Sequence, residues 1–89
     1  MTYTIKLSEA AQKDLKKLNP QIAKRILQVL FDRVAHLEDP RSIGDALHGE
    51  VMGKYWKYRI GDYRVISHIT DAMLEILVIQ VGHRREVYR

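Results

Sequence analysis

The chain has 89 residues, enough for one small hydrophobic core, so we expect a single domain over residues 1–89. An apolar fraction of 46% and a charged fraction of 29% are those of a globular protein, which excludes a disordered or low-complexity chain. Cysteine is absent, and this excludes disulfides, thiolate metal sites and a cysteine nucleophile.

The net charge of +4 favours acidic partners such as nucleic acid or an acidic protein segment. No apolar run approaches the length that spans a membrane, and the first residues lack the apolar core of a signal sequence. We therefore expect a cytoplasmic protein without a membrane partner.

The N-terminal half predicts a strand and two helices. Residues 2–7 alternate between apolar and polar side chains, which indicates a strand. Ser8 is a typical N-cap for a helix whose apolar stripe is Ala11, Leu15 and Leu18. Asn19 and Pro20 are an equally strong start signal for a second helix, which should reach about Glu38. The two helices should form a helical hairpin.

The C-terminal half predicts strands. Residues 41–46 have the composition of a loop, and Leu47 should anchor that loop in the core. Three strands are expected after it, over about 54–60, 63–70 and 73–81, the last with apolar residues on both faces and therefore central in the sheet. The fold class is α+β in the order β-α-α-β-β-β, with a mostly antiparallel four-stranded sheet and the helical hairpin packed on one face.

The hairpin around Gly61-Asp62 is the most informative segment. Glycine at the first central position suits a two-residue type II′ turn between two strands rich in aromatic and β-branched residues. That turn fixes the register, which pairs Ile60 with Tyr63, Arg59 with Arg64 and Lys57 with Ile66.

Period-two alternation then gathers Lys57, Arg59 and Arg64 on one face of the sheet, with Asp62 as the nearby acid. Like charges directly across a strand pair destabilise it, so Arg59 against Arg64 predicts an anionic ligand such as a phosphate backbone. Lys54 is a further phosphate-binding residue, and Tyr55 on the same face could stack on a base or pack in the core. The alternative for the whole face is a solvated surface that keeps the sheet soluble.

The chain resembles the RelE branch of the RelE/ParE toxin superfamily of type II toxin–antitoxin systems along nearly its whole length. The resemblance lies in the order and spacing of Leu47-His48-Gly49, Trp56-Lys57-Tyr58-Arg59, Tyr63-Arg64-Val65-Ile66 and the ending Val81-Gly82-His83-Arg84-Arg85-Glu86-Val87-Tyr88. It implies an enzyme, a ribosome-dependent endoribonuclease that cleaves messenger RNA without a metal or cofactor and inhibits translation.

The resemblance also implies roles for single residues. The basic strand residues of the family fall on Lys57 and Arg59, its transition-state arginine on Arg64, its C-terminal arginine on Arg84 and its tyrosine on Tyr88. The family has lysine where this chain has Arg59, and the segment between Arg84 and Tyr88 is shorter. Arg85 joins the phosphate-binding residues.

RNA cleavage by attack of a 2′-hydroxyl needs a base, cations for the charge on the phosphorane, and an acid for the departing 5′-oxygen. Neighbouring positive charges disfavour the ammonium form of Lys57, which makes it the leading base. Arginine stays protonated, so Arg59 and Arg64 are assigned to the phosphate. His83 is a further candidate for the acid, and its alternative is an exposed residue at the end of a strand.

Two other functions stay open: a ParE-like inhibitor of DNA gyrase on the same fold, and a noncatalytic module that binds nucleic acid or an antitoxin. The partners implied by the resemblance are a cognate antitoxin, the ribosome with bound messenger RNA, and operator DNA reached through the antitoxin in a toxin–antitoxin hetero-oligomer. His36 and His48 have no partner at metal-ligand spacing, and no metal is expected.

Overall fold

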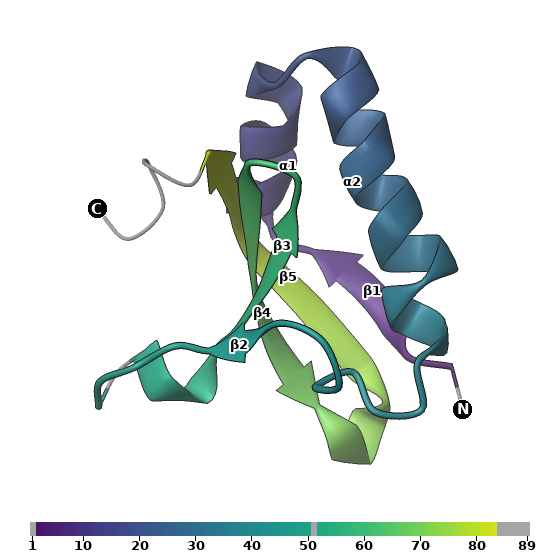
Figure 1. Ribbon diagram of the computed structural model, residues 1–89, viewed down its shortest axis with the longest axis vertical. Coiled ribbons are helices and arrows are strands. Elements are labelled where there is room, and N and C mark those ends of the chain that lie inside the picture. Colours follow the sequence, from purple (N-terminus) through teal and green to yellow (C-terminus); the bar gives the residue numbers. More distant parts are fainter. Residues whose placement is uncertain (1, 51, 84–89) are drawn as a thin grey trace.

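The computed structural model describes residues 2–50 and 52–83. Its elements in chain order are β1 (Thr4–Leu7), α1 (Glu9–Lys17), α2 (Pro20–Asp32), a 3₁₀ turn (Val34–His36), β2 (Asp45–Ala46), a 3₁₀ turn (Met52–Lys54), β3 (Trp56–Ile60), β4 (Tyr63–Thr70), a 3₁₀ turn (Asp71–Met73) and β5 (Glu75–His83), as Figure 1 shows. The fold is α+β, as the sequence predicts.

The sheet has five strands in the order β1-β5-β4-β3-β2. The prediction of four strands was wrong by one, because part of the segment expected as a loop forms the short edge strand β2. The other four strands lie close to their predicted positions. The last strand, β5, lies inside the sheet between β1 and β4, and the middle strand is β4. Only β1 pairs in parallel, with β5, so the sheet is mostly antiparallel.

Both helix starts are confirmed by their caps. The Ser8 side chain accepts a hydrogen bond from the backbone N–H of Ala11, and the Asn19 side chain accepts one from that of Gln21. The second helix is shorter than predicted, because α2 ends at Asp32 and the chain continues as a 3₁₀ turn and then an extended segment. The apolar pattern continues through that turn, since Val34 and Ala35 are buried, and pattern alone did not locate the helix end.

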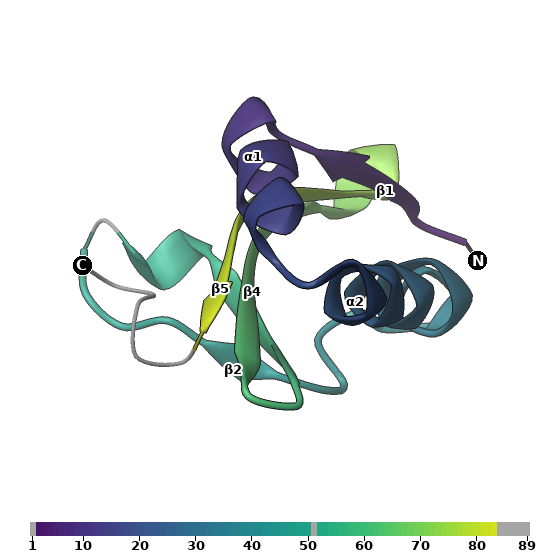
Figure 2. The same ribbon diagram turned by 90° about the horizontal axis from the view of Figure 1, so that it is seen from above.

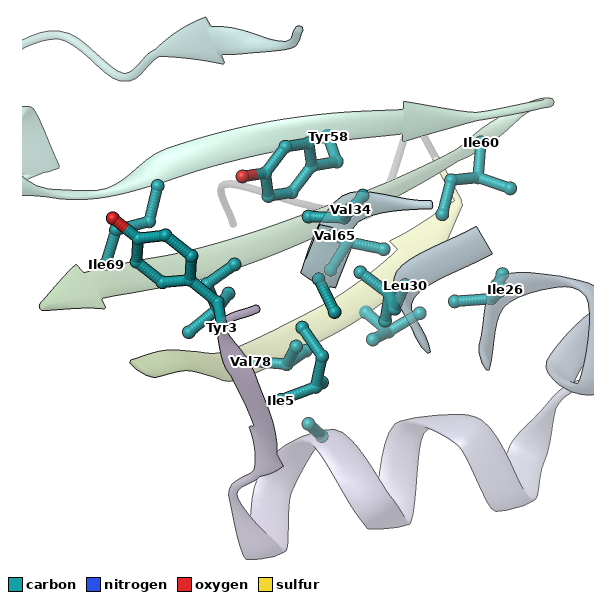
Figure 3. Packing of buried hydrophobic residues seen from close by; sticks show 14 of the residues in the cluster. Tyr3, Ile5, Ile26, Leu30, Val34, Tyr58, Ile60, Val65, Ile69 and Val78 are labelled. Atoms are coloured by element: carbon teal, nitrogen blue, oxygen red, sulfur yellow. The ribbon is translucent and has the colours of Figure 1, made fainter. Parts of the chain in front are cut away.

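The main core lies between the sheet and the helical hairpin. Figure 3 shows Ile60 and Val65 of the sheet pointing toward Ile26 and Leu30 of α2, and the Tyr58 ring belongs to the same buried cluster. Viewed from above, α2 lies on one side of β4 and β5, and the 3₁₀ turn Met52–Lys54 lies on the opposite side (Figure 2). We call the sheet face that the helices leave uncovered the open face.

Within the part of the chain that the structure describes, no helix is long and apolar enough to cross a membrane. The longest, α2, has 13 residues.

Candidate nucleic-acid interface

The register of the β3–β4 hairpin is the predicted one. Ile60 pairs with Tyr63, Arg59 with Arg64 and Lys57 with Ile66. Gly61 has φ +59°, and among the described residues the one non-glycine residue with positive φ is Leu74. Positive φ at the first central position and not at the second is the requirement of the predicted type II′ turn.

The three predicted cations share the open face, and we call Lys57, Arg59 and Arg64 the basic face. The face is fixed by alternation, because Tyr58, Ile60 and Val65 between them are buried in the main core on the opposite side. Lys57 and Arg64 are half-buried and Arg59 is exposed.

Arg64 makes a weak hydrogen bond and lies across the ladder from a glycine. Its neighbour across the ladder on β5 is Gly82, which has no side chain. The Nη1 atom of Arg64 donates to the carbonyl oxygen of Tyr63 at 3.5 Å, the long limit of a hydrogen bond. A phosphate oxygen would be a stronger partner for this guanidinium.

A small apolar cluster lies beside the basic face. Leu47 and Ile66 are buried there, and Tyr55 and Ile79 pack against them. Leu47 therefore anchors its loop as predicted, but in this second cluster instead of the main core. Tyr55 is half-buried, so the packing alternative describes its ring better than an open stacking platform.

Two polar side chains contact the Tyr55 ring. The Lys54 ammonium lies 5.2 Å from the ring centroid, a cation–π distance. The His68 ring meets it edge-on at 5.9 Å between centroids. These contacts place Lys54 next to the basic face, where the sequence predicted it.

An acid that the sequence analysis did not identify also lies on the basic face. Asp45 of β2 pairs directly with Lys57 in the ladder, and its Oδ2 lies 3.5 Å from Nε of Arg59. Asp62 is therefore not the only acid near these cations. Because the two side chains are 58% and 54% exposed, the ion pair contributes only about 0 to 1 kcal/mol to stability. It nevertheless offsets the repulsion between Arg59 and Arg64, which weakens repulsion as an argument for a ligand.

Strand β2 is held in place by two aromatic side chains of β3. Trp56 Nε1 donates to the carbonyl oxygen of Ile43 at 2.7 Å, and the buried Tyr58 hydroxyl donates to that of Pro40. Burial raises the pKa of Tyr58, which keeps this donor protonated. The segment before β2 is thus tied to β3 at two points.

Gly44 completes this attachment. It has φ +88°, and a Cβ at this position would lie 2.6 Å from Trp56 Nε1 and even closer to the carbonyl oxygen of Lys57. The glycine thus lets the chain turn tightly against β3, and Asp45 follows it directly. Gly44 is the one sequence signal that could have suggested β2.

A β-bulge sets the face of the sheet on which the last side chains of β5 lie. Ile66 pairs with Gln80 and Ser67 with Val78, so Ile79 is the extra residue. As a result Val78 and Val81, three residues apart, both face the main core. His83 pairs with Tyr63 and contacts its ring edge-on at 5.6 Å, on the helix side of the sheet. This puts His83 on the face opposite to Arg64, which argues against its role as the acid.

The bulge is held by α1 and its N-cap. Ser8 Oγ donates to the carbonyl oxygen of Ile79 at 3.3 Å, and the backbone N–H of Val81 donates to Asp14 Oδ2 at 3.0 Å. Strand β1 stops pairing at Val78, so these side chains take over the edge of β5 that it leaves. Like Asp45, Asp14 is a residue that no sequence pattern singled out.

Arg84, Arg85 and Tyr88, which were predicted to complete the site, lie outside the described residues. Over residues 2–50 and 52–83, no three histidine, aspartate or glutamate side chains are grouped so that they could hold a metal ion. What the described part provides is a surface of cations on rigid strands, suited to an anion.

Comparison with known proteins agrees with the sequence resemblance. Residues 5–88 match the family model for the ParE toxin of the type II toxin–antitoxin system parDE. The toxin RelG of Mycobacterium tuberculosis is 30% identical over 89 residues, which cover 100% of this chain and 99% of RelG. The toxin RelE of the same organism is 29% identical over 87 residues, which cover 98% of this chain and 87% of RelE.

Solved structures of toxins show the same fold. A chain of the toxin–antitoxin complex RelBE2 from M. tuberculosis superposes with a TM-score of 0.85 at 27% identity, covering 97% of this chain and 95% of that one. A chain of the archaeal RelE–RelB complex from Pyrococcus horikoshii gives 0.72 at 27% identity, covering 98% and 100%. The family model carries the ParE name, whereas these relatives carry Rel names. The chain therefore belongs to the RelE/ParE superfamily of type II toxin–antitoxin toxins and is of the RelE type.

Proposed function

We propose that this toxin is a ribosome-dependent endoribonuclease that cleaves messenger RNA and so inhibits translation in the cytoplasm. The observation that carries the proposal is the position of Lys57, Arg59 and Arg64 on one open face, two of them directly paired across the hairpin. A phosphate bound there would meet several cations on rigid strands, the arrangement that stabilises charge developing on a phosphorane.

In the proposed reaction, the 2′-oxygen of a ribose attacks the adjacent phosphorus and the bond from phosphorus to the 5′-oxygen breaks. The products are a 2′,3′-cyclic phosphate and a 5′-hydroxyl. Lys57 in its neutral form would take the proton of the 2′-hydroxyl, and a proton must reach the leaving 5′-oxygen. Arg59 and Arg64 would hold the non-bridging oxygens, since guanidinium groups do not act as bases.

The remaining roles rest on the resemblance alone. Arg84 is proposed to bind the scissile phosphate and assist the leaving group, with Arg85 as a further phosphate contact. Tyr88 is proposed to stack on a base or to position the 2′-hydroxyl. His83 receives no step, because it lies against Tyr63 on the other face of the sheet.

The proposed partners are the ribosome with bound message and a cognate antitoxin. Exposed cations of the helical hairpin, namely Lys13, Lys16, Lys17, Lys24 and Arg25, offer phosphate contacts to ribosomal RNA. The relatives crystallised as RelB complexes support an antitoxin here. An apolar strip on α2 around Leu27 and Phe31, the latter 45% exposed, could receive an amphipathic segment of it. Such a complex could reach operator DNA through the antitoxin.

The test is primer extension on a defined message in a translating extract. Wild type should produce cuts that depend on translation, and Arg64→Ala should lower the cleavage rate by roughly 10² to 10³-fold, the cost of removing one preorganised donor to a developing anion. Lys6→Ala is the matched control, because it removes an exposed cation from β1, at the sheet edge away from the basic face, and should cleave at the wild-type rate.

Inhibition of DNA gyrase is the second candidate, since the matching family model is that of the ParE toxin. A supercoiling assay with the same preparations separates the two. Inhibited gyrase with an intact message would establish the second function. If the wild-type protein neither cleaves the message nor inhibits gyrase, a noncatalytic binding module remains.

A further inference from the structure

Asp45 is the acid that the structure brings onto the basic face. Its Cα lies directly across the ladder from Lys57, and its carboxylate contacts Arg59, which is two residues further along β3. Any phosphate that binds Arg59 must therefore share or displace this carboxylate. We propose that Asp45 is a competing anion that lowers the affinity of the basic face for RNA.

The position of Asp45 is fixed by the backbone. Strand β2 is hydrogen-bonded to β3, Trp56 Nε1 holds the carbonyl oxygen of Ile43, and the N–H of Leu47 donates to the carbonyl oxygen of Tyr55 at 3.2 Å. These attachments lie on both sides of Asp45. The carboxylate consequently remains beside the basic face even when its contact with Arg59 is broken.

The contact itself is loose. It is a single approach of 3.5 Å to Nε, and both side chains are more than half exposed. An exposed pair of this kind does not fix the orientation of a guanidinium, which excludes a role in holding Arg59 rigid. What remains is the charge of Asp45, which neutralises one cation of the face and repels an incoming phosphate.

The consequence is a preference for RNA that is held in place by other contacts over RNA that is free in solution. Because Asp45 neutralises part of the basic face, free RNA binds there weakly. Stable binding of RNA to the basic face then depends on further contacts at the place where the message is held. This inference rests on the proposed function, because it assumes that RNA is the ligand of the basic face.

The test measures binding without cleavage. A fluorescein-labelled oligouridylate with methylated 2′-hydroxyls reports binding to wild type, Asp45→Asn and Asp62→Asn by fluorescence polarisation over a salt series. Asp62 in the hairpin turn is the matched control, since it is exposed and its replacement changes the net charge equally. Thermal unfolding verifies that the variants are folded.

Asp45→Asn should bind roughly threefold to fivefold more tightly at low salt, the range expected for release of one exposed ion pair. The slope of log affinity against log salt should steepen by about 0.7, the value for one more phosphate contact on a single strand. Asp62→Asn should change affinity less than twofold. In an Arg59→Ala background, most of the gain from Asp45→Asn should disappear.

Equal or weaker binding by Asp45→Asn, relative to Asp62→Asn, would overturn the role of Asp45 and leave the proposed function intact. Absence of binding by wild type and all variants would instead overturn RNA as the ligand of the basic face, and the competition proposal with it.

Discussion

Lys57 and His83 show how the structure separates the two side chains that the sequence offers for proton transfer, the lysine as the leading base and the histidine as a candidate acid. Lys57 lies on the open face beside Arg59, and His83 lies across the sheet against Tyr63. A general base must reach the 2′-hydroxyl of a bound strand within hydrogen-bond distance. Of the two, Lys57 shares its face with the arginines that would bind the phosphate.

Lys57→Ala should therefore lower cleavage by about 10² to 10⁴-fold, the usual contribution of a general base. The limb of the pH–rate profile that rises as the base loses its proton should disappear in this variant and persist in His83→Ala. The measurement is kcat/KM against pH with a defined message. Loss of that limb in His83→Ala alone would transfer the role of base to the histidine.

At the scale of elements, β2 shows how an edge strand too short to leave a pattern can still shape a site. It contributes two residues to the sheet, and its attachment depends on side chains of β3 and on Gly44. A Cβ on Gly44 has no room, because backbone and indole atoms surround it. At Gly49, which also has positive φ (+101°), nothing lies within 4 Å of the added atom.

Gly44→Ala should consequently lower the free energy of unfolding by about 1 to 3 kcal/mol more than Gly49→Ala, which carries the backbone strain without the overlap. Urea denaturation of the two variants measures the difference. An equal loss of unfolding free energy in the two variants would mean that β2 can move away from β3 without a free-energy cost. The strand would then be only loosely attached.

At the scale of the whole molecule, one cluster joins three distant segments. Tyr3 before β1 donates its hydroxyl to Asp71 Oδ1 at 2.8 Å, and Arg41 Nη1 lies 3.0 Å from the same oxygen. Hydrogen bonds from Arg41 and Tyr3 lower the pKa of Asp71, and the bond to Asp71 raises the pKa of Tyr3. The cluster fastens the end of the sheet that lies away from the β3–β4 turn.

These pKa shifts predict that the cluster loses its contribution to stability at both ends of the pH range, in acid through Asp71 and in alkali through Tyr3. The contribution of Asp71 to stability is present above its unfolded pKa of about 4 and is lost as pH falls through the lower folded pKa. That of Tyr3 is present below about pH 10 and is lost as pH rises through the raised pKa. The melting temperature of Asp71→Asn should thus fall below that of wild type at neutral pH and approach it in acid.

The melting temperature of Tyr3→Phe should approach that of wild type at alkaline pH, where the Tyr3 hydroxyl loses its proton. Thermal unfolding of the three proteins across the pH range measures both limits. If the difference in melting temperature between wild type and Asp71→Asn stays constant as the pH falls, the charged carboxylate does not stabilise the cluster.

The sequence by itself determined the hairpin register, both helix starts and the shared face of Lys57, Arg59 and Arg64. These depend on local chemistry: a glycine that adopts positive φ, side chains that cap the first turn of a helix, and the alternation of a strand. Only the tertiary structure showed that Asp45 lies on the same face of the sheet as the cations and that His83 lies on the opposite face. Asp45 is placed by hydrogen bonds from side chains of another strand, and His83 is turned by one extra residue at Ile79, held by Ser8 and Asp14 from the far end of the chain. Contacts between such distant positions leave no periodic trace in the sequence.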